Sequence, residues 1–284
     1  MSEFDYNADY PCDEDKDTCG VSVASVFDFI GFPYKITKPI RLIELFAGIG
    51  AQSSALERIG ANYEPWRVIE NDKYALESYN AVHGTNFELQ DIKDVKGKDL
   101  GIVDTDKYEY LLTYSFPCVD LSLSGRRKGA DEGSGTRSSL LWEVKRLLNE
   151  CKELPQVLML ENVPQVHSTE NRANFEKWCD FLESKGYRSY WCDLNARDFG
   201  VPQNRLRCYM ISFLGEGSYK FPEGRPLEKT MLDCLEENVP EEFYITNDSA
   251  WKMIDKLVQE GKMPIGNKVR KALPTADDLE EDDW

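Results

Sequence analysis

Two residues that could take part in catalysis come directly after apolar runs typical of buried β-strands. Cys118 follows Pro117 at the end of the run YEYLLTYSF, and a proline before a cysteine restricts the backbone that carries the thiol. A thiolate there could act as a nucleophile if a nearby positive charge lowers its pKa. Glu161 follows the run VLML. A carboxyl group enclosed in a cleft has a raised pKa and can donate a proton near neutral pH.

Two arginines add positive charge to this set. Arg205 and Arg207 lie two residues apart in the segment QNRLR, so in an extended backbone they share one face. Their guanidinium groups could stabilise an anionic oxygen or the thiolate. We therefore expect a nucleophile, an acid and a cation to converge in one cleft.

A glycine-containing turn earlier in the chain indicates a ligand with a nucleoside part. In the segment FAGIG, Gly48 and Gly50 would let the backbone approach a ligand at a helix N-terminus. Ser53 stands where the dinucleotide fingerprint has its third glycine, so a pyrophosphate is not indicated. Glu70, 22 residues after Gly48, is placed to accept hydrogen bonds from both ribose hydroxyls, and Asp91 could receive an adenine amino group. The alternatives are a turn without a ligand and carboxylates that only form turns.

The elements that would position these residues alternate along the chain. Strands are predicted over 41–48, 63–72, 87–92, 108–116, 157–163, 188–196 and 207–214, and helices over 53–60, 73–84, 140–154 and 174–185. This alternation predicts an α/β fold with a doubly wound, mostly parallel sheet. Ligands bind such sheets at the carboxyl ends of the strands, where the residues above lie.

The composition excludes several classes of protein. The 284 residues carry 34 Lys and Arg against 51 Asp and Glu, a formal net charge of −17, and 41% of them are hydrophobic. Such a chain can fill a substantial core, which excludes disorder throughout. No run approaches the roughly 20 apolar residues that span a bilayer, so neither a membrane protein nor a secreted one is expected. The charge disfavours broad attraction to phosphate, so contact with nucleic acid must come from a local basic patch.

The cysteines and histidines show no pattern typical of a metal site. The eight cysteines include no C-x-x-C pair, and the two histidines are His83 and His167, so no metal is expected. Cys192 and Cys208 lie in apolar segments and are predicted to be buried and reduced. This cysteine usage fits a reducing cytoplasm.

Four motifs, in order, resemble those of the cytosine carbon-5 DNA methyltransferases. They are FAGIG, PC-x-x-x-S, ENV and Q-x-R-x-R, and they fall within residues 40–215. The resemblance implies the Rossmann-like fold of S-adenosylmethionine-dependent methyltransferases, with S-adenosylmethionine as the methyl donor. The cofactor-binding residues that it implies are Phe46, Gly48, Gly50, Glu70, Asp91, Ile92, Pro117 and Leu140.

The resemblance also implies a mechanism. Cys118 would add to carbon 6 of cytosine while Glu161 hydrogen-bonds or protonates ring nitrogen 3, so that carbon 5 can attack the methyl group. Arg205 and Arg207 would hold the base oxygen or steady the site. The base must first be flipped out of the duplex. A loop that contacts DNA, for which a merely solvated basic loop is the alternative, would contain Ser122, Ser124, Arg126, Arg127 and Lys128.

The sequence departs from the family pattern in two places. Val119 follows the cysteine, where the family usually has a glutamine that helps to fill the gap left by the flipped base. Towards the carboxyl end, the segment Ile265–Val269 is at most a remnant of the family's G-N-x-V motif. We therefore expect either a separate target-recognition subunit or a naturally shortened enzyme, acting on cytosine-containing duplex DNA in the cytoplasm of a bacterial host or a phage-infected cell.

The expected organisation has four parts. They are an acidic leader over 1–39 with a short helix at 21–30, a cofactor-binding and catalytic domain over 40–215, a linker or truncated second region over 216–264, and an acidic tail over 265–284. The main interpretation is a DNA cytosine-5 methyltransferase. The alternatives are a non-catalytic or partner-dependent protein that binds cofactor and DNA, an RNA cytosine methyltransferase, and an oxidoreductase that uses a nicotinamide cofactor.

Overall fold

The computed structural model describes residues 19–21, 33–118, 131, 133–136, 138–230, 232–236, 239–240 and 247–260. The chain divides into two compact units, Met1–Glu228 and Lys229–Trp284. The second unit contains helix α5 (Asp248–Gln259), which begins where the Asn247 side chain accepts a hydrogen bond from the Ser249 amide. No helix among the described residues is long and apolar enough to cross a membrane.

A seven-stranded sheet with the order β1-β6-β7-β5-β4-β2-β3 forms the centre of the first unit. The strands β2 to β5 pair in parallel, whereas β7 runs antiparallel to both β5 and β6, and β1 runs antiparallel to β6. The five strands from β2 to β6 therefore share one direction, which confirms the mostly parallel α/β sheet. The strands are β1 (Cys19–Val21), β2 (Ile40–Leu45), β3 (Tyr63–Ile69), β4 (Glu109–Tyr114), β5 (Val157–Asn162), β6 (Tyr187–Asn195) and β7 (Leu206–Leu214).

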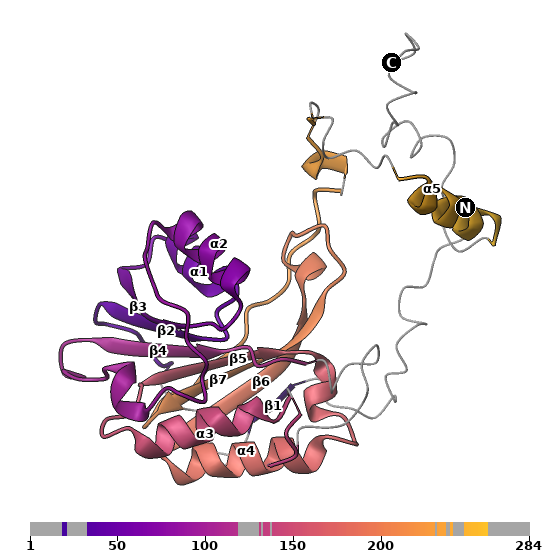
Figure 1. Cartoon of the computed structure of the whole chain (residues 1–284). Coiled ribbons are helices and arrows are strands. Elements are labelled where there is room, and N and C mark those ends of the chain that lie inside the picture. The colour runs from indigo at the N-terminus through magenta and orange to yellow at the C-terminus, as the bar shows by residue number, and fades with distance from the viewer. Residues whose placement is uncertain are drawn as a thin grey trace. The chain divides into compact units, whose positions relative to one another are not determined.

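Helices cover both faces of the sheet, as expected for a doubly wound fold (Figure 1). Helices α1 (Ala51–Arg58) and α2 (Lys73–His83) lie on one face, and α3 (Leu141–Glu150) and α4 (Arg172–Ser184) lie on the other. The shorter 3₁₀ helices are η2 (Gly97–Leu100), η3 (Ser138–Leu140), η4 (Pro164–His167), η5 (Ala196–Asp198) and η6 (Leu232–Cys234).

The bounds of α2 show how local sequence sets an element. The Asp72 carboxylate accepts hydrogen bonds from the backbone amides of Tyr74 and Ala75 at the start of the helix, and Gly84 adopts a left-handed conformation at its end. The predicted helix over 73–84 is confirmed.

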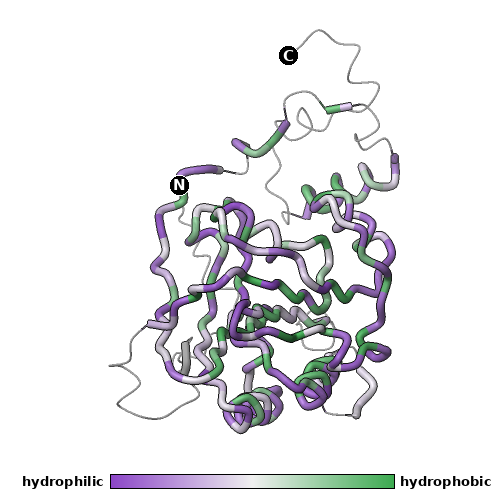
Figure 2. The backbone as a smooth tube through the Cα atoms, turned by 90° about the vertical axis from the view of Figure 1, so that its left-hand side faces the viewer, coloured by the Kyte–Doolittle hydropathy of each residue, from purple (hydrophilic) through white to green (hydrophobic). Residues whose placement is uncertain are grey.

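The main core lies between the sheet and helices α3 and α4. Its side chains include Leu112 and Leu160 from the strands and Leu147 and Trp178 from the helices, all fully buried. Hydrophobic stretches occur in the strands at the centre of the unit and on the helices that flank them (Figure 2). Trp178 donates its indole N–H to the Tyr114 hydroxyl oxygen at 3.0 Å, so burial of this ring leaves no polar group unpaired.

The prediction of a strand over residues 87–92 is wrong. This segment is described throughout and forms neither helix nor strand. The Asn80 side chain instead donates to the Phe87 carbonyl oxygen at 3.0 Å and accepts from the Phe87 amide at 2.9 Å. Because these backbone groups pair with a helix side chain, they are not available to a neighbouring strand. Asp91 therefore lies in a loop rather than at a strand end.

The leader contributes a strand that the sequence did not indicate. Strand β1 places Cys19 opposite Cys192 of β6, and Val21, expected to begin a short helix, ends this strand instead. Cys208 is buried and free as predicted, but Cys192 is disulfide-bonded, which corrects the expectation that it is reduced. The rest of the leader, the segment Ile265–Val269 and the acidic tail lie outside the described residues.

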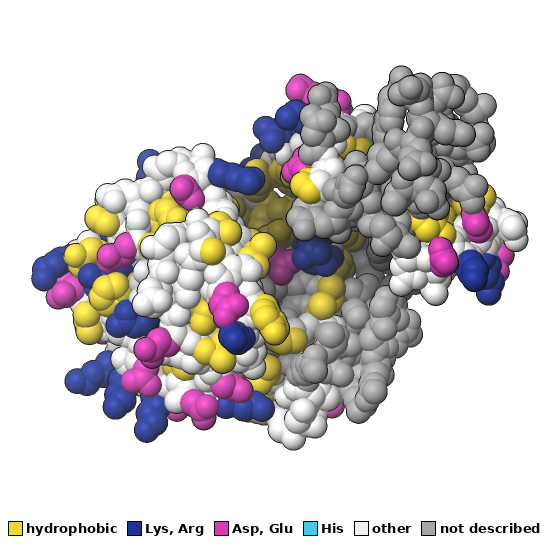
Figure 3. All heavy atoms as spheres, turned by 45° about the horizontal axis from the view of Figure 1, so that its top comes forward, with side chains coloured by type: hydrophobic (Ala, Val, Ile, Leu, Met, Phe, Trp, Pro, Cys, Tyr) yellow, Lys and Arg dark blue, Asp and Glu magenta, His cyan; other side chains and the backbone are white. Residues whose placement is uncertain are grey.

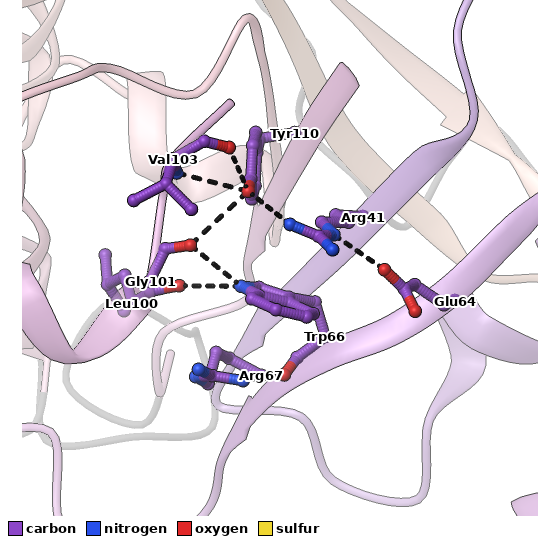
Figure 4. A network of polar contacts seen from close by, with 8 residues as sticks. All are labelled: Arg41, Glu64, Trp66, Arg67, Leu100, Gly101, Val103 and Tyr110. Atoms are coloured by element: carbon purple, nitrogen blue, oxygen red, sulfur yellow. Dashed lines mark hydrogen bonds and ion pairs between the residues drawn. The ribbon is translucent and has the colours of Figure 1, made fainter. Parts of the chain in front are cut away.

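One arginine ties the amino-terminal ends of three strands together (Figure 4). The Arg41 guanidinium lies 3.7 Å from the ring centre of Trp66 and 3.6 Å from that of Tyr108. It also donates to the Tyr110 hydroxyl at 2.9 Å and to the Glu64 carboxylate at 2.6 Å. The Glu64 side chain is half exposed, so its ion pair contributes little. The contacts of the guanidinium with the two aromatic rings should therefore dominate.

We predict that Arg41→Lys lowers the free energy of unfolding by about 1–2 kcal/mol, because an ammonium group cannot stack between two rings. Glu64→Gln is the matched control and should cost less than about 0.5 kcal/mol. Urea unfolding followed by tryptophan fluorescence measures both changes. Equal effects of the two substitutions would contradict the dominance of stacking.

Candidate functional site

The predicted site residues gather at one edge of the sheet because of the strand directions. The parallel strands β2, β3, β4 and β5 all end at this edge. Strand β7 is antiparallel to β5, with Asn162 opposite Cys208, so β7 begins where β5 ends. Glu161 at the end of β5 and Arg207 at the start of β7 therefore meet, although they are 46 residues apart in the sequence.

The glycine turn after β2 has an unusual backbone conformation. Phe46 has a φ of 59°, and Gly48 and Gly50 have φ values of 56° and 82°. A left-handed conformation is uncommon for a residue such as phenylalanine and costs about 1–3 kcal/mol. The hydrogen bond from the Phe46 amide to the Ile69 carbonyl oxygen, at 2.9 Å, helps to hold it.

A glycine is also required at position 50 because there is no space for a side chain. A Cβ atom there would lie 2.6 Å from the Tyr79 ring and 2.3 Å from the His83 imidazole, both on α2, whereas a Cβ at Gly48 would meet no described atom within 4 Å. The turn thus packs directly against helix α2 at Gly50 and leaves space at Gly48.

A buried carboxylate lies beneath this turn. Glu44 is 1% exposed, and it accepts hydrogen bonds from the Tyr79 hydroxyl at 2.6 Å and from the Ser53 amide at 3.3 Å. Burial raises the pKa of the Glu44 carboxyl group above its usual range, while the hydrogen bond from Tyr79 acts in the opposite direction. Glu44 links the first turn of α1 to α2, so the two helices that flank the glycine turn share one anchor.

Glu70 organises the backbone at the end of β3. Its Oε2 accepts from the Gly48 amide at 2.7 Å, and its Oε1 accepts from the amides of Asn71 and Asp72 at 2.9 Å and 2.8 Å. A carboxylate has about four acceptor positions, so these bonds occupy most of them. The remaining position on Oε2 can accept from a ligand hydroxyl.

A cavity of about 420 Å³ opens beside Glu70. This volume falls in the range of small-molecule sites, and the lining combines apolar and polar side chains. Six of the eight residues predicted to bind a cofactor line it: Phe46, Glu70, Asp91, Ile92, Pro117 and Leu140. Gly48 and Gly50 shape the adjoining turn instead. The lining residues that sequence analysis missed are Ile69, Asn71, Asp72, Gln90 and Lys93.

Two side chains fix the segment that carries Cys118. Asn162, which is 3% exposed, donates to the Phe116 carbonyl oxygen at 3.0 Å. The Ser138 hydroxyl donates to the Pro117 carbonyl oxygen at 2.8 Å. Sequence analysis missed both residues, although Asn162 belongs to the ENV motif and follows the predicted carboxylate directly.

Cys118 is placed differently from the other described cysteines, because it directly follows a residue of the cavity wall. It is free and partly buried, as are Cys151 and Cys179. Burial raises the pKa of Cys151 to about 11 and that of Cys179 to about 12. The pKa of Cys208 is also well above its usual value, because of burial and then the charge of Asp193. These three thiols are poor nucleophiles at neutral pH.

Glu161 is paired with both predicted arginines. Its Oε1 lies 3.2 Å from Nε of Arg207 and 3.6 Å from Nη2 of Arg205. Arg207 is 22% exposed and Arg205 is 47% exposed, so the pair with Arg207 is the less screened. The side-chain oxygen Oδ1 of Asn195 accepts a hydrogen bond from the Arg205 backbone amide at 3.0 Å and holds the start of β7 against the end of β6.

The predicted DNA-contacting loop lies outside the described residues. This applies to Ser122, Ser124, Arg126, Arg127 and Lys128, and also to Val119. On the face of the first unit in Figure 3, acidic and basic side chains are interspersed. The described side chains of that face therefore form no broad surface of one charge for a phosphate backbone.

The fold and the site define an α/β protein with a cavity of small-molecule size, a cysteine that follows one residue of its wall, and a glutamate paired with two arginines. Comparison with known proteins agrees. The profile of the C-5 cytosine-specific DNA methylase family matches residues 40–275, and the chain belongs to this family.

Individual relatives support the same conclusion. The chain is 33% identical over 263 residues to Type II methyltransferase M2.ScrFI of Lactococcus lactis subsp. cremoris, covering 74% of this chain and 71% of the relative. It is 34% identical over 265 residues to Orphan methyltransferase M.SssI of Spiroplasma monobiae, covering 74% and 68%. The Dnmt2 methyltransferase of S. pombe has a similar structure, with a TM-score of 0.59, 26% identity and coverage of 75% of this chain and 65% of that chain. The chain thus spans about two thirds of the length of these proteins.

We predict that Gly50→Ala lowers the free energy of unfolding by about 1–3 kcal/mol more than Gly48→Ala does. Both substitutions meet a left-handed backbone, but only at Gly50 does the new methyl group collide with side chains of α2. Urea unfolding of the two variants measures the difference. Equal losses would show that a glycine is needed at position 50 because of backbone strain and not because of contact with α2.

Proposed function

We propose that the chain transfers a methyl group from S-adenosylmethionine to carbon 5 of cytosine in duplex DNA. The observation that carries the proposal is the arrangement at one sheet edge. Cys118 directly follows the wall of the cavity, and the carboxylate of Glu161, on the neighbouring strand, is held by two arginines. Strands β4 and β5 pair with Tyr114 opposite Leu160, so the segments carrying Cys118 and Glu161 leave the sheet from adjacent positions.

The cavity fits a nucleoside-containing cofactor. Phe46 and Ile92 give apolar surface for an adenine ring, the free acceptor position of Glu70 suits a ribose hydroxyl, and Asp91 suits an amino group. S-adenosylmethionine would supply an electrophilic methyl group on a sulfonium. Gly48, Gly50, Pro117 and Leu140 complete the proposed set, the glycines by shaping the turn and the other two as part of the wall.

The pairing of Glu161 suggests how it would hold the base. Both arginines approach Oε1, so among the described residues these ion pairs leave Oε2 open towards a ligand. Oε2 would interact with ring nitrogen 3 of a flipped cytosine, and Arg207 would stabilise negative charge nearby. The arginines also keep the carboxylate from turning away.

The proposed reaction begins at the thiolate of Cys118. Its sulfur adds to carbon 6, Glu161 donates a proton to ring nitrogen 3, and the electron pair moves to carbon 5. Carbon 5 would then take the methyl group of the sulfonium, whose sulfur–methyl bond breaks and leaves a neutral thioether. Removal of the carbon 5 proton by a base, return of the nitrogen 3 proton to Glu161 and expulsion of the thiolate restore the aromatic ring and release Cys118. The chain's own contribution is to hold the nucleophile and the acid in place.

We predict that Cys118→Ser abolishes the covalent adduct with DNA containing 5-fluorocytosine and lowers methyl transfer by at least about 10³-fold, because the nucleophile is lost. Affinity for S-adenosylmethionine should stay within about threefold of the parent chain, since only the residue after Pro117 changes. Transfer of labelled methyl groups, denaturing gels and calorimetric binding measure the three quantities. Cys234→Ser changes an exposed thiol in the second unit and is the matched control.

Two other outcomes of these measurements would contradict the proposal. Cofactor binding without adduct or transfer would make the chain a non-catalytic binding protein, and transfer to RNA alone would make it an RNA methyltransferase.

We also propose that a separate polypeptide contributes to target recognition. The same assay tests this by adding the product of a neighbouring gene, and an unchanged rate and sequence preference would contradict it.

We predict that Arg207→Ala slows adduct formation by at least about tenfold and Arg205→Ala by only a few fold. Arg207 is closer to Glu161 and less exposed, so its charge is less screened. Single-turnover adduct formation measures both, with Arg58→Ala at the exposed end of α1 as the control. A larger effect of Arg205→Ala would show that Arg205, and not Arg207, is the more important partner of Glu161.

A further inference from the structure

A second cluster of reactive side chains lies outside the proposed active site. It consists of His167, Asp193 and Cys208, whose donor atoms all lie within 4.8 Å of one another. The three residues come from η4, β6 and β7 respectively. Asp193 and Cys208 stand opposite each other in the β6–β7 ladder, so the backbone fixes their separation.

The cluster is largely enclosed. Cys208 is fully buried, and the side chains of His167 and Asp193 are 15% and 7% exposed. His167 lies with its ring centre 4.6 Å from that of Trp191 and 6.0 Å from that of Phe175. These neighbours hold the imidazole with Nε2 towards the carboxylate, 3.0 Å from each of its oxygens. The partial exposure of His167 gives a small ion a route in from solvent.

The donor set matches the preferences of one metal. An imidazole nitrogen, a carboxylate oxygen and a thiolate sulfur are all ligands of Zn²⁺. Tetrahedral zinc, with bonds of about 2.0–2.3 Å, needs its donor atoms roughly 3.4–3.8 Å apart. Shifts of about an ångström or less therefore convert the present cluster into a coordination sphere. A dication would also neutralise the carboxylate and the thiolate in an environment where unpaired charge is costly.

We propose that His167, Asp193 and Cys208 bind one Zn²⁺ ion, with water completing the coordination. The site is separate from the proposed nucleophile and cavity, and none of its residues is needed for the methyl-transfer steps above. By linking η4 to β6 and β7, the ion would brace β7, which carries Arg207, and the short helix η4 that follows β5. The alternative is a set of hydrogen bonds centred on Asp193 with no metal.

The test uses the full chain after removal of metal with a chelator. We expect one equivalent of Zn²⁺ to bind with a dissociation constant of about 1 μM or below, measured by competition with a chromophoric chelator. We expect Co²⁺ to bind at the same site and to give the absorption bands of a thiolate-bound, tetrahedral ion. Binding should also raise the midpoint of thermal unfolding.

Variants identify the ligands. Cys208→Ser should weaken Zn²⁺ binding at least about 100-fold and remove the thiolate-to-Co²⁺ band. His167→Gln changes the most exposed ligand, so it supplies a second test if Cys208→Ser does not fold. His83→Gln and Cys234→Ser, at the other histidine and at an exposed cysteine, are the matched controls and should bind Zn²⁺ as the parent does.

Three results would overturn the proposal. They are absence of stoichiometric binding to the parent chain, a Co²⁺ spectrum without a thiolate band, and loss of binding in Cys234→Ser or Cys118→Ser while His167→Gln retains it. The first or second would support the hydrogen-bonded alternative. None of them bears on methyl transfer, because adduct formation at Cys118 is measured independently.

Discussion

The antiparallel pairing of β7 with β5 is the constraint on which the site depends. In a sheet made only of parallel strands, the start of every strand lies at the edge opposite to the carboxyl ends. Arg205 and Arg207 would then lie a full strand length away from Glu161. Reversal of β7 brings them to the same edge, where both arginines reach one carboxylate oxygen. The same reversal places Cys208 beside Asp193, so both side-chain clusters follow from one feature of topology.

The cavity depends on a second constraint, a buried carboxylate whose two oxygens each accept a hydrogen bond from a neighbouring helix. Glu44 would be costly to bury alone, but it receives hydrogen bonds from α1 and α2. These bonds fix both helices against β2, and Gly50 then lets the turn lie directly on α2. Glu70 joins the other side of the turn to β3 through the Gly48 amide. The strained Phe46 backbone is therefore supported from two sides before any ligand binds.

The sequence was sufficient for the features that depend on local patterns. Period-2 and period-3.6 runs located most elements, because each apolar face must be buried in this fold. The segment 87–92 failed because a side chain of α2, and not a strand, pairs with its backbone. Asn162 was missed because a buried amide that supports a backbone carbonyl has no signature of its own. The His167, Asp193 and Cys208 cluster was missed because spacing rules seek ligands that are close in sequence, and these come from three separate elements.

The segment from Phe116 to Cys118 shows why the two halves of the site cannot be considered separately. The carbonyl groups of Phe116 and Pro117 are held by side chains from β5 and from η3. Pro117 is part of the cavity wall, and the thiol belongs to the next residue. A shift of β5 would therefore move the candidate nucleophile and reshape the cavity together. Because Glu161 is next to Asn162, the same strand also carries the carboxylate. One strand thus sets the position of the acid directly and that of the nucleophile through a single buried hydrogen bond.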